Sequence, residues 1–413
     1  MKILIIGSGG REHALANAFA QSPRLESLVV SPGNAGIARY YTCVQLSGFA
    51  EIKQYCLKTA VDFVFIGGEQ PVADGLTDYL RASGIRVIGP SQAAGRIETS
   101  KAFSKALMKK YAIPTAEYVR AGTYEEACSL LGSFSFPVVL KADGLAAGKG
   151  VFIADSREEA CDALLYLFQN PGKEGVIIEE YLLGWEVSLF SFCDGRNHLS
   201  TIFSQDHKQL YDNDCGPNTG GMGVLAPIPE AEPYRDEIED KIISPILKAM
   251  QLEGCPFTGV LYCGLMITSG GPKVLEFNCR WGDPEAEAVL PLLDTDLVDI
   301  CEAIDKQELD NLKLNWLDKT AVTVVLSSRN YPGTPDTGYP ISLDGDISST
   351  ICYAGVSHNG DTLINSGGRV MMLTALGEDL MQAREQVYRD AGKVSFEGKY
   401  FRKDIGLRSN KLY

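Results

Sequence analysis

The sequence predicts an α/β protein built from several domains, and three observations indicate this fold class. The chain has 413 residues, of which 45% are hydrophobic and 22% charged, which is typical of a globular protein of two to four domains. Short apolar runs ended by glycine or proline alternate with helical patterns near the N-terminus. Glycine-rich polar segments then separate further strands and helices, which predicts a mixed α and β region after an open α/β domain.

The N-terminal segment predicts the open α/β domain. Residues 2–6 form an apolar run that GSGG follows, and a helical pattern begins at Arg11. The runs LESLVVSPG, DFVFIGG and GIRVIGP repeat the pattern of strand and turn, so we expect a domain of about 100 residues. A glycine turn at the start of a helix suits a substrate phosphate or carboxylate, because free N–H groups and the helix dipole both favour an anion there.

A nicotinamide-binding dehydrogenase is the obvious rival for this segment, and two features argue against it. The fingerprint G-x-G-x-x-G requires glycine where Glu12 stands. The second predicted strand ends in VVSPGNAG, without the acidic residue that would bind a ribose hydroxyl. The sequence therefore disfavours a dehydrogenase.

The middle of the chain predicts a small α+β lid. From Ser100, SKAFSKALMKKY predicts a helix that Pro114 ends. FPVVLKA and GVFIA are typical of strands, REEACDALLYLF of a helix, and GVIIEEYL of a further strand.

The stretch KADGLAAGKGV, between two of these strands, has only part of the pattern of a P-loop. A P-loop needs four residues between its first glycine and the Gly-Lys pair, followed by Ser or Thr. Three residues separate Gly144 from Gly148, and Gly150 follows Lys149, so no hydroxyl is placed for a metal. A glycine-rich turn with one lysine can still bind phosphates through backbone N–H groups, with a plain surface turn as an equal alternative.

Three carboxylates follow the predicted lid. Glu179 and Glu180 end an apolar strand, and Glu186 begins the next one. Exposed backbone groups at a strand end can bind an adenine edge, and a nearby carboxylate can accept both ribose hydroxyls. The alternative, that acidic residues flank a turn for solubility, stays open on these residues alone.

The segment SQDHKQLYDNDCGPNTGGMGVLAP is polar, glycine-rich and long for a connection between strands. Such a segment is either a disordered excursion or a functional loop, and its polar side chains suit substrate recognition. His207 lies in it. Because none of the four histidines has a chelating spacing, we expect His207 to position other groups rather than to bind a metal.

The run KVLEFNCRWGDPEAEAVLP predicts a metal site. Glu276 and Asn278 are two residues apart, so on a strand their side chains share one face. A carboxylate beside an amide oxygen suits magnesium. Arg280 shares the alternation while the strand lasts and can bind a carboxylate or phosphate with two hydrogen bonds. A solvated edge strand is the alternative, which the apolar neighbours in this strand weaken.

Composition limits the partners and the location of the protein. The net charge of −15 and the pI near 4.9 argue against nucleic acid and anionic membranes, while a local basic pocket for a phosphorylated metabolite stays compatible. No apolar run reaches the roughly 20 residues of a membrane span, and MKILIIG is too short for a signal peptide. Eleven cysteines without a C-x-x-C pair fit reduced thiols. We expect a cytoplasmic protein.

Together these motifs resemble those of the ATP-grasp ligases, and more closely those of the glycinamide ribonucleotide synthetase family. KADGLAAGKGV, GPNTGGMG and EFNCRWGDPE are together highly specific, whereas GSGGREHA alone is a moderate signal. The resemblance begins at MKILIIGSGGREHALA, continues through PSQAAGRIETSKAFSK, IIEEYL and SQDHK, and ends at FRKDIG, so it covers essentially the whole chain. It implies an ATP-grasp fold with an N-terminal open α/β (pre-ATP-grasp) domain and a small β-rich C-terminal domain.

The resemblance also implies the domain ranges. We expect an N-terminal substrate-binding domain at 1–100, a central ATP-grasp domain at 101–120 and 188–325, its lid at 121–187, and a C-terminal domain at 326–413.

The implied reaction joins glycine to 5-phosphoribosylamine in purine biosynthesis. ATP would phosphorylate the glycine carboxylate, and the amine would attack the glycyl phosphate to give the amide, ADP and phosphate. A carboxylate is a poor acyl donor until one oxygen becomes a leaving group, and an acyl phosphate must be shielded from water, so a closing lid is needed. The resemblance implies ATP as co-substrate, Mg²⁺ or Mn²⁺ as the metal, and no nucleic acid or membrane partner; we expect a monomer.

The resemblance assigns a role to each motif. The ATP-binding residues would be Lys101, Lys141, Gly148, Lys149, Gly150, Glu179, Glu180, Tyr181, Leu182 and Glu186. The metal would be held by Glu276 and Asn278. The substrates would be bound by Gly9, Gly10, Arg11, Asp206, Asn218, Thr219, Gly220, Gly221, Met222, Arg280 and Asp283, with the sugar phosphate at the first three. The catalytic residues would be Arg280, Asp283 and Lys149.

Two departures from the family pattern leave questions open. Many ATP-grasp enzymes carry another metal carboxylate about a dozen residues before the Glu-x-Asn pair, where this chain has LYCGLMIT. The region LSSRNYPG is poorer in glycine than expected, which leaves the contribution of the C-terminal domain open.

Two other functions fit part of this pattern. One is a biotin- or aminoimidazole-dependent carboxylase that uses bicarbonate, which GPNTGGMG and CRWGDPE argue against. The other is a non-catalytic nucleotide sensor, which needs affinity but no metal pair poised for transfer. The lysines together with Glu276 and Asn278 argue against the sensor.

Overall fold

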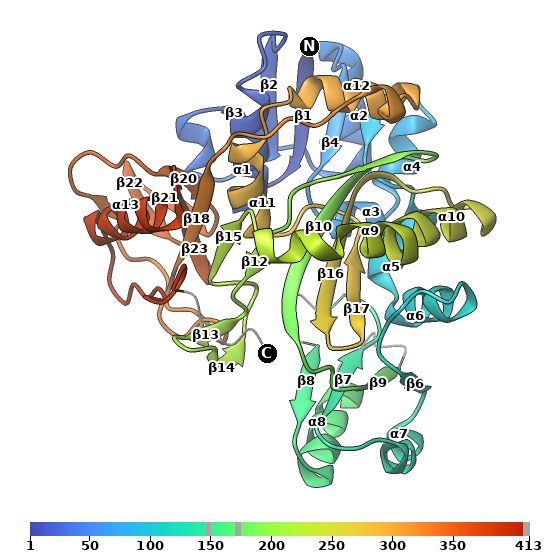
Figure 1. Cartoon of the computed structure of the whole chain (residues 1–413). Coiled ribbons are helices and arrows are strands. Elements are labelled where there is room, and N and C mark those ends of the chain that lie inside the picture. The colour runs from blue at the N-terminus through green and yellow to red at the C-terminus, as the bar shows by residue number, and fades with distance from the viewer. Residues whose placement is uncertain (146–149, 170–174, 408–413) are drawn as a thin grey trace.

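The computed structural model describes residues 1–145, 150–169 and 175–407 and arranges them as four main β-sheets with helices packed around them (Figure 1). In Figure 1 the N-terminal sheet lies at the top, a lid projects at the bottom, and the C-terminal segment lies on the left. This is the predicted multi-domain α/β architecture.

The N-terminal sheet is parallel throughout, with the order β3-β2-β1-β4-β5. The four inner residues of β1 are buried, as expected for a parallel strand with helices on both faces. The strand order reverses at β1, and in open α/β sheets ligands bind where the order reverses. The strands are β1 (Lys2–Gly7), β2 (Ser27–Pro32), β3 (Thr42–Cys43), β4 (Phe63–Ile66) and β5 (Val87–Ile88), and the helices are α1 (Gly10–Phe19), α2 (Gly48–Thr59), α3 (Glu69–Ala73), α4 (Leu76–Arg81) and α5 (Gln92–Thr99).

The lid is an antiparallel sheet of order β6-β9-β7-β8 with two helices. Its buried apolar side chains, from residues 119–178 only, form a cluster separate from the rest of the molecule. The lid therefore has a core of its own and is built as one body. Its elements are β6 (Tyr118–Ala121), α7 (Tyr124–Leu130), β7 (Val138–Ala142), β8 (Val151–Ala154), α8 (Arg157–Gln169) and β9 (Val176–Glu180).

The central sheet has the order β11-β10-β16-β17 and is antiparallel. The segment that the sequence left open as a disordered excursion or a functional loop is ordered and contains four short strands. The central strands are β10 (Trp185–Asp194), β11 (His198–Ser200), β16 (Thr258–Thr268) and β17 (Gly271–Asn278); the short strands are β12 (Gln205–Asp206), β13 (Gln209–Tyr211), β14 (Cys215–Asn218) and β15 (Gly223–Ala226). The helices are α6 (Lys101–Lys110), α9 (Arg235–Ile238), α10 (Ser244–Leu252), α11 (Glu285–Val289) and α12 (Leu297–Lys306).

A fourth sheet, of order β12-β15-β18-β23-β20, joins the central and C-terminal segments. Its middle strand β18 (Thr320–Ser327) pairs with β15 on one side and β23 on the other, so it spans the expected boundary between 325 and 326. We keep the four domain ranges as a proposal. The remaining elements are β19 (Ser342–Leu343), β20 (Thr350–Tyr353), β21 (Val356–Asn359), β22 (Thr362–Asn365), β23 (Arg369–Gly377), α13 (Leu380–Lys393) and β24 (Val394–Ser395).

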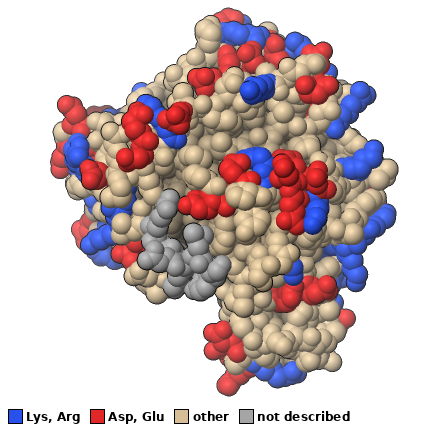
Figure 2. Space-filling model, in the orientation of Figure 1, with Lys and Arg blue, Asp and Glu red and all other residues tan. Residues whose placement is uncertain are grey.

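Charge and hydropathy of the folded chain agree with its composition. The face drawn in Figure 2 carries acidic and basic side chains together. In the described part of the chain, no helix is long and apolar enough to cross a lipid bilayer. All eleven cysteines are free thiols.

A buried histidine connects the N-terminal and C-terminal domains. His13 in α1 is 1% exposed, and its Nδ1 accepts a hydrogen bond of 3.0 Å from the backbone N–H of Tyr353 in β20. The two rings are also stacked, with centroids 5.8 Å apart. Burial lowers the pKa of His13 to about 4.

The lowered pKa of His13 predicts that the folded protein becomes less stable in acid. Between pH 6.5 and about 4 the unfolded chain takes up a proton at His13 that the folded chain does not, so the free energy of unfolding falls as the pH falls. From pH 7 to pH 5 the wild type is expected to lose about 2 kcal/mol more than His13→Gln does, by the linkage relation. Denaturant unfolding at the two pH values measures this difference, and equal losses in both proteins would contradict it.

Candidate active site

A buried carboxylate joins two lysines where the lid meets the central sheet. Glu179 in β9 is 2% exposed, and its two oxygens lie 3.1 Å from Lys105 Nζ and 2.9 Å from Lys141 Nζ. Lys141 Nζ also donates to the backbone oxygen of Leu275 in β17. Burial lowers the pKa of Lys105 to about 8, although Glu179 opposes the shift. Glu179 therefore fixes the direction of Lys141, which lies in β7 beside the glycine-rich loop.

Lys101 approaches the same loop from the start of α6. Its Nζ donates to the backbone oxygen of Gly144 over 3.1 Å, and burial lowers its pKa while Glu276 opposes the shift. The predicted Gly148 and Lys149 lie outside the described residues. Gly150 is buried, and its carbonyl accepts a hydrogen bond from the N–H of Ala142.

The segment between β9 and β10 carries the predicted adenine site. Leu182 belongs to a small apolar cluster with Ala116, Met266 and Leu275, apart from the larger cores, and Tyr181 is 39% exposed. An apolar surface suits the face of a purine ring, and backbone groups next to it can bind the edge of the ring. The neighbouring carboxylates are paired: Glu180 with Lys273 at 2.9 Å, and Glu186 with Lys208 at 3.0 Å.

The predicted metal pair lies at the end of β17. Glu276 faces Gly264 and Asn278 faces Tyr262 in the ladder with β16, so both side chains lie on one face. Burial opposes a charge on Glu276, yet its pKa is lowered, because four cationic groups face it. They belong to Lys208, Lys141, Lys101 and Arg280.

These two oxygen donors fit a divalent ion that arrives with phosphates. Glu276 is held as an anion, and the side-chain N–H of Asn278 donates to the backbone oxygen of Phe277, which leaves the amide oxygen as its acceptor. No group of three or more His, Cys, Asp and Glu residues that could hold a metal ion occurs in the described ranges. Magnesium is commonly held by one or two carboxylates plus substrate phosphates, so the pair fits an ion that a nucleotide helps to bind.

Arg280 lies beyond the end of β17, and each of the three nitrogens of its guanidinium group has a partner. Its Nε lies 3.1 Å from Glu69, its Nη2 lies 2.9 Å from Glu98, and its Nη1 donates to the backbone oxygen of Trp281. Both carboxylates come from the N-terminal part of the chain, so Arg280 ties that part to the central sheet. A substrate anion would compete with them for this guanidinium.

The glycine-rich segment after β14 packs against Asp206. Gly221 has a φ of +110°, and a Cβ there would lie 2.6 Å from Asp206 Oδ1, so a side chain has no room. Asp206 Oδ1 is buried without a hydrogen-bond partner in the described part of the structure, and burial together with Glu285 raises the Asp206 pKa well above its usual value.

The other predicted residues of this loop serve its internal structure. The Thr219 hydroxyl donates to the backbone oxygen of Lys208 and accepts the N–H of Gly221, while the Asn218 amide oxygen accepts from Gln209. Met222 is fully buried. His207 Nδ1 donates to the backbone oxygen of Gly223, in keeping with the expected positioning role.

The start of α1 is surrounded by carboxylates. Glu12 accepts the Gly9 N–H at 2.6 Å and the Arg11 Nε at 2.8 Å, and Asp283 accepts the Arg11 N–H at 3.3 Å. Glu12 thus occupies the place of the third fingerprint glycine as a helix cap. Its negative charge at the helix start disfavours a pyrophosphate there, in line with the rejection of a dehydrogenase.

A further buried carboxylate lies under the first turn of α1. Glu287 in α11 is 0% exposed, and a Cβ on Gly10 would lie 2.5 Å from its Oε1. Among the described residues neither oxygen has a hydrogen-bond partner, and burial together with Asp283 raises the Glu287 pKa well above its usual value. Glu287 was not predicted from the sequence.

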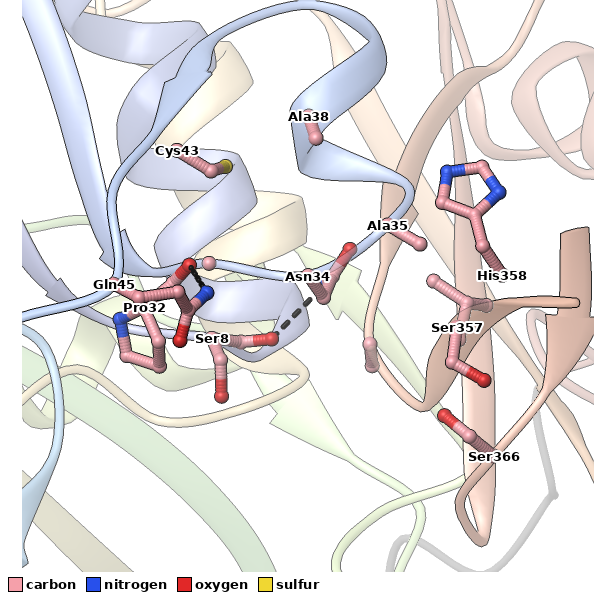
Figure 3. A pocket seen from close by; sticks show the side chains of 13 residues that line it. Ser8, Pro32, Asn34, Ala35, Ala38, Cys43, Gln45, Ser357, His358 and Ser366 are labelled. Carbon is pink, nitrogen blue, oxygen red and sulfur yellow. Dashed lines mark hydrogen bonds between the residues drawn. The ribbon is translucent and has the colours of Figure 1, made fainter. Parts of the chain in front are cut away.

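A cavity of about 490 Å³ adjoins the start of α1 (Figure 3). Ser8 and the turn after β2 line one side of it, and Ser357, His358 and Ser366 of the C-terminal segment line the other. Asn34 Nδ2 donates to the Ser8 backbone oxygen over 2.8 Å and so shapes the wall. None of the described residues lining it is a lysine or arginine.

Comparison with known protein families shows to which family the chain belongs. The model of the phosphoribosylglycinamide synthetase N domain matches residues 1–98, that of its ATP-grasp (A) domain residues 99–286, and that of its C domain residues 321–408. The chain belongs to the phosphoribosylglycinamide synthetase family.

Curated relatives of this family match over the full chain. The phosphoribosylamine–glycine ligase of Caldanaerobacter subterraneus is 45% identical over 413 residues, which are 98% of this chain and 99% of the relative. The human trifunctional purine biosynthetic protein adenosine-3 is 41% identical over 99% of this chain, which spans 42% of that protein.

Solved structures agree with the family assignment. The phosphoribosylamine–glycine ligase of Thermotoga maritima has a TM-score of 0.87 and 36% identity, over 98% of this chain and 100% of that one. The biotin carboxylase of Campylobacter jejuni has a TM-score of 0.72 at 13% identity, over 98% and 94%, and shows the shared ATP-grasp fold alone. The predicted fold class is therefore confirmed.

Three further residues beside the candidate site were not predicted from the sequence. Lys105 is four residues after Lys101 on α6, and that spacing would have placed both ammonium groups on one side of the helix. Arg369 carries no such local signal, because its partner Gly220 lies 149 residues away, and the burial of Glu287 depends on the packing of the whole fold.

Proposed function

We propose that this chain ligates glycine to 5-phosphoribosylamine at the expense of ATP, through glycyl phosphate, to give glycinamide ribonucleotide, ADP and phosphate. The family assignment supports the reaction class. The observation that carries the site is the convergence of the Glu276–Asn278 pair with lysines from α6, the lid and the loop after β12.

The nucleotide is proposed to lie between the lid and the central sheet. Its adenine would rest on the cluster around Leu182, with the backbone at Leu182 binding its edge and Glu180 and Tyr181 beside it. Glu186, which pairs with Lys208, would accept the ribose hydroxyls. Glu179 holds Lys141, so we propose that it acts through this lysine.

The phosphates are proposed to meet Lys101, Lys141 and the loop that ends at Gly150, with Lys149 assigned by family resemblance only. Glu276 and Asn278 would hold the divalent ion. When bound, such an ion neutralises phosphate charge and stabilises the charge that develops during phosphoryl transfer. The lysines bind and orient the γ-phosphoryl group in the same place.

The substrates are proposed to bind where the loops of Asp206, Gly220 and Asp283 meet the start of α1. The carboxylates around Gly9, Gly10 and Arg11 suit the amine of phosphoribosylamine. In place of the sequence-based expectation, we therefore propose that its phosphate lies toward Ser8 and the adjoining cavity, where hydroxyl groups rather than lysine or arginine would bind it. The glycine ammonium group would face Asp206, with Asn218 to Met222 forming the wall. Arg280 and Asp283 complete this site.

The proposed reaction has two steps, and it uses the nucleotide site and the substrate site in turn. The glycine carboxylate attacks the γ-phosphorus of ATP and becomes a mixed anhydride, with ADP as leaving group. The amine then attacks the acyl carbon, phosphate leaves, and the amine loses a proton. The lid, built around its own core, would exclude water while the acyl phosphate exists.

The deciding experiment measures ADP and phosphate release from ATP and Mg²⁺, with phosphoribosylamine generated in situ and glycine, alanine or bicarbonate added separately. We expect release only with glycine and an equal amount of amide product. Stimulation by bicarbonate would point to a carboxylase, and ATP binding without release would point to a sensor. In a second experiment with the same assay, ribose 5-phosphate, which lacks the amine, is added as an inhibitor. It should compete with phosphoribosylamine for binding and should not compete with ATP.

Three finer points are proposed with this function. Magnesium is the working ion, and substitution of Mn²⁺ in the same assay tests the preference. The chain acts as a monomer, which light scattering measures. Its place in the cell is the cytoplasm, which fractionation tests.

A further inference from the structure

A single guanidinium group joins two loops of the substrate site. Arg369, the first residue of β23, donates from Nη1 to the backbone oxygens of Gly220 and Asp283, over 2.5 and 2.6 Å. Its Nη2 lies 2.9 Å from Asp283 Oδ1. Gly220 belongs to the GPNTGGMG segment and Asp283 to the RWGDPE segment, so one side chain of the C-terminal domain spans both.

Both backbone groups of Gly220, its N–H and its oxygen, form hydrogen bonds with side chains of the C-terminal domain. Its N–H donates to the Tyr331 hydroxyl over 2.8 Å, while its oxygen accepts from Arg369. A Cβ on Gly220 would lie 3.1 Å from Arg369 Cζ and 3.3 Å from both terminal nitrogens, so the guanidinium lies flat against this glycine. The glycine at this position is thus explained by a partner 149 residues away.

Through Gly220 and Asp283, Arg369 is connected to the side chains that we propose to face the substrates. Asp283 is held by Arg369 through one oxygen, and its other oxygen accepts the Arg11 N–H at the start of α1. On the other side, Gly221 lies against Asp206. A shift of Arg369 therefore displaces both Asp283 and the loop that packs on Asp206.

We propose that Arg369 is a positioning residue for the glycine and phosphoribosylamine sites, and that the C-terminal domain completes the substrate site through it. This inference rests on the proposed function. Arg369 acts through Gly220 and Asp283, in a planar arrangement that lysine cannot reproduce, because a guanidinium offers several donors in one plane and an ammonium group does not.

The test compares Arg369→Ala and Arg369→Lys with the wild type. We expect the KM for glycine to rise at least tenfold in both, while the KM for ATP stays within twofold, because the contacts of Arg369 are with Gly220 and Asp283 and, among the described residues, with none of those that we assign to the nucleotide. Added guanidinium ion should restore part of the glycine affinity in Arg369→Ala and none in Arg369→Lys.

A matched control is available in the same domain. Arg384 in α13 also donates to two distant backbone oxygens, those of Ile405 and Lys403, at 3.0 and 2.7 Å, but both lie within the C-terminal domain. Arg384→Ala should lower the thermal midpoint and leave both KM values unchanged. If Arg369→Ala behaves in the same way, Arg369 only stabilises the fold and the proposal is overturned.

A second variant keeps the inference testable if Arg369→Ala does not fold. Gly220→Ala pushes the guanidinium by a few tenths of an ångström and leaves its charge in place. It should raise the KM for glycine and spare that for ATP; an unchanged KM for glycine would count against the proposal. Failure of the function itself would look different, because the wild type would then release no ADP in response to glycine.

Discussion

Replacing Glu276 with alanine is expected to lower kcat by about 10²- to 10³-fold while nucleotide binding stays measurable. Losing a group that stabilises charge in the transition state has an effect of this order. Glu276 is buried and kept anionic by the cations around it, and with Asn278 it is the oxygen pair that fits the divalent ion. The loss falls on the transition state more than on the bound nucleotide, because the charge to be stabilised develops during transfer.

Two measurements separate this role from a general loss of structure. Calorimetric titration of ADP with and without Mg²⁺ should show that the metal strengthens binding to the wild type and no longer does so in Glu276→Ala. Glu253→Gln removes a surface carboxylate that pairs with Lys110, and it should leave kcat and the Mg²⁺ effect unchanged. Near-normal turnover in Glu276→Ala would remove Glu276 from the metal site.

Replacing Lys141 with methionine should lower kcat by about 10²-fold and raise the KM for ATP. The substitution keeps most of the length of the side chain and removes the charge that we place against the phosphates. The effect is of the size seen when one preorganised donor is lost from an active site. Single-turnover measurement of ADP formation reports the transfer step directly.

Lys105→Met is the matched control for Lys141. It removes a charge from the same carboxylate, Glu179, but the Nζ of Lys105 donates to the hydroxyl of Thr115, whereas that of Lys141 donates to the backbone of β17. We expect a smaller effect on kcat than in Lys141→Met. Equal losses in the two variants would mean that charge balance at Glu179 matters, and that Lys141 makes no separate contact with phosphate.

The sequence predicted several strands and helices of the N-terminal segment and of the lid well, because their signals are local. The runs LVVSP, FVFI and VVLKA became β2, β4 and β7, and the predicted helix after Ser100 is α6. The pair Glu276 and Asn278 shares a face because β17 keeps its alternation through both. Each of these features depends on neighbours within a few residues.

The pairing of charged groups could not be predicted in the same way. Arg280 reaches Glu69 and Glu98, which lie about 200 residues earlier, and Arg369 reaches the loop of Gly220. Glu287 is notable because its carboxylate has no hydrogen-bond partner among the described residues, a property that depends on the whole packing around it. Such features come from tertiary contacts, and residue type and spacing carry no trace of them.

The shared sheet limits how this enzyme can be divided or recombined. Because β18 pairs with β15 on one side and β23 on the other, a cut near residue 320 would expose the hydrogen-bonding groups of β15. Such an open strand is a template for pairing with another chain and promotes aggregation. The C-terminal domain is thus not an exchangeable cassette: a chimera with a relative's domain must carry the matching strand with it, and fusion to a further enzyme must leave this sheet intact.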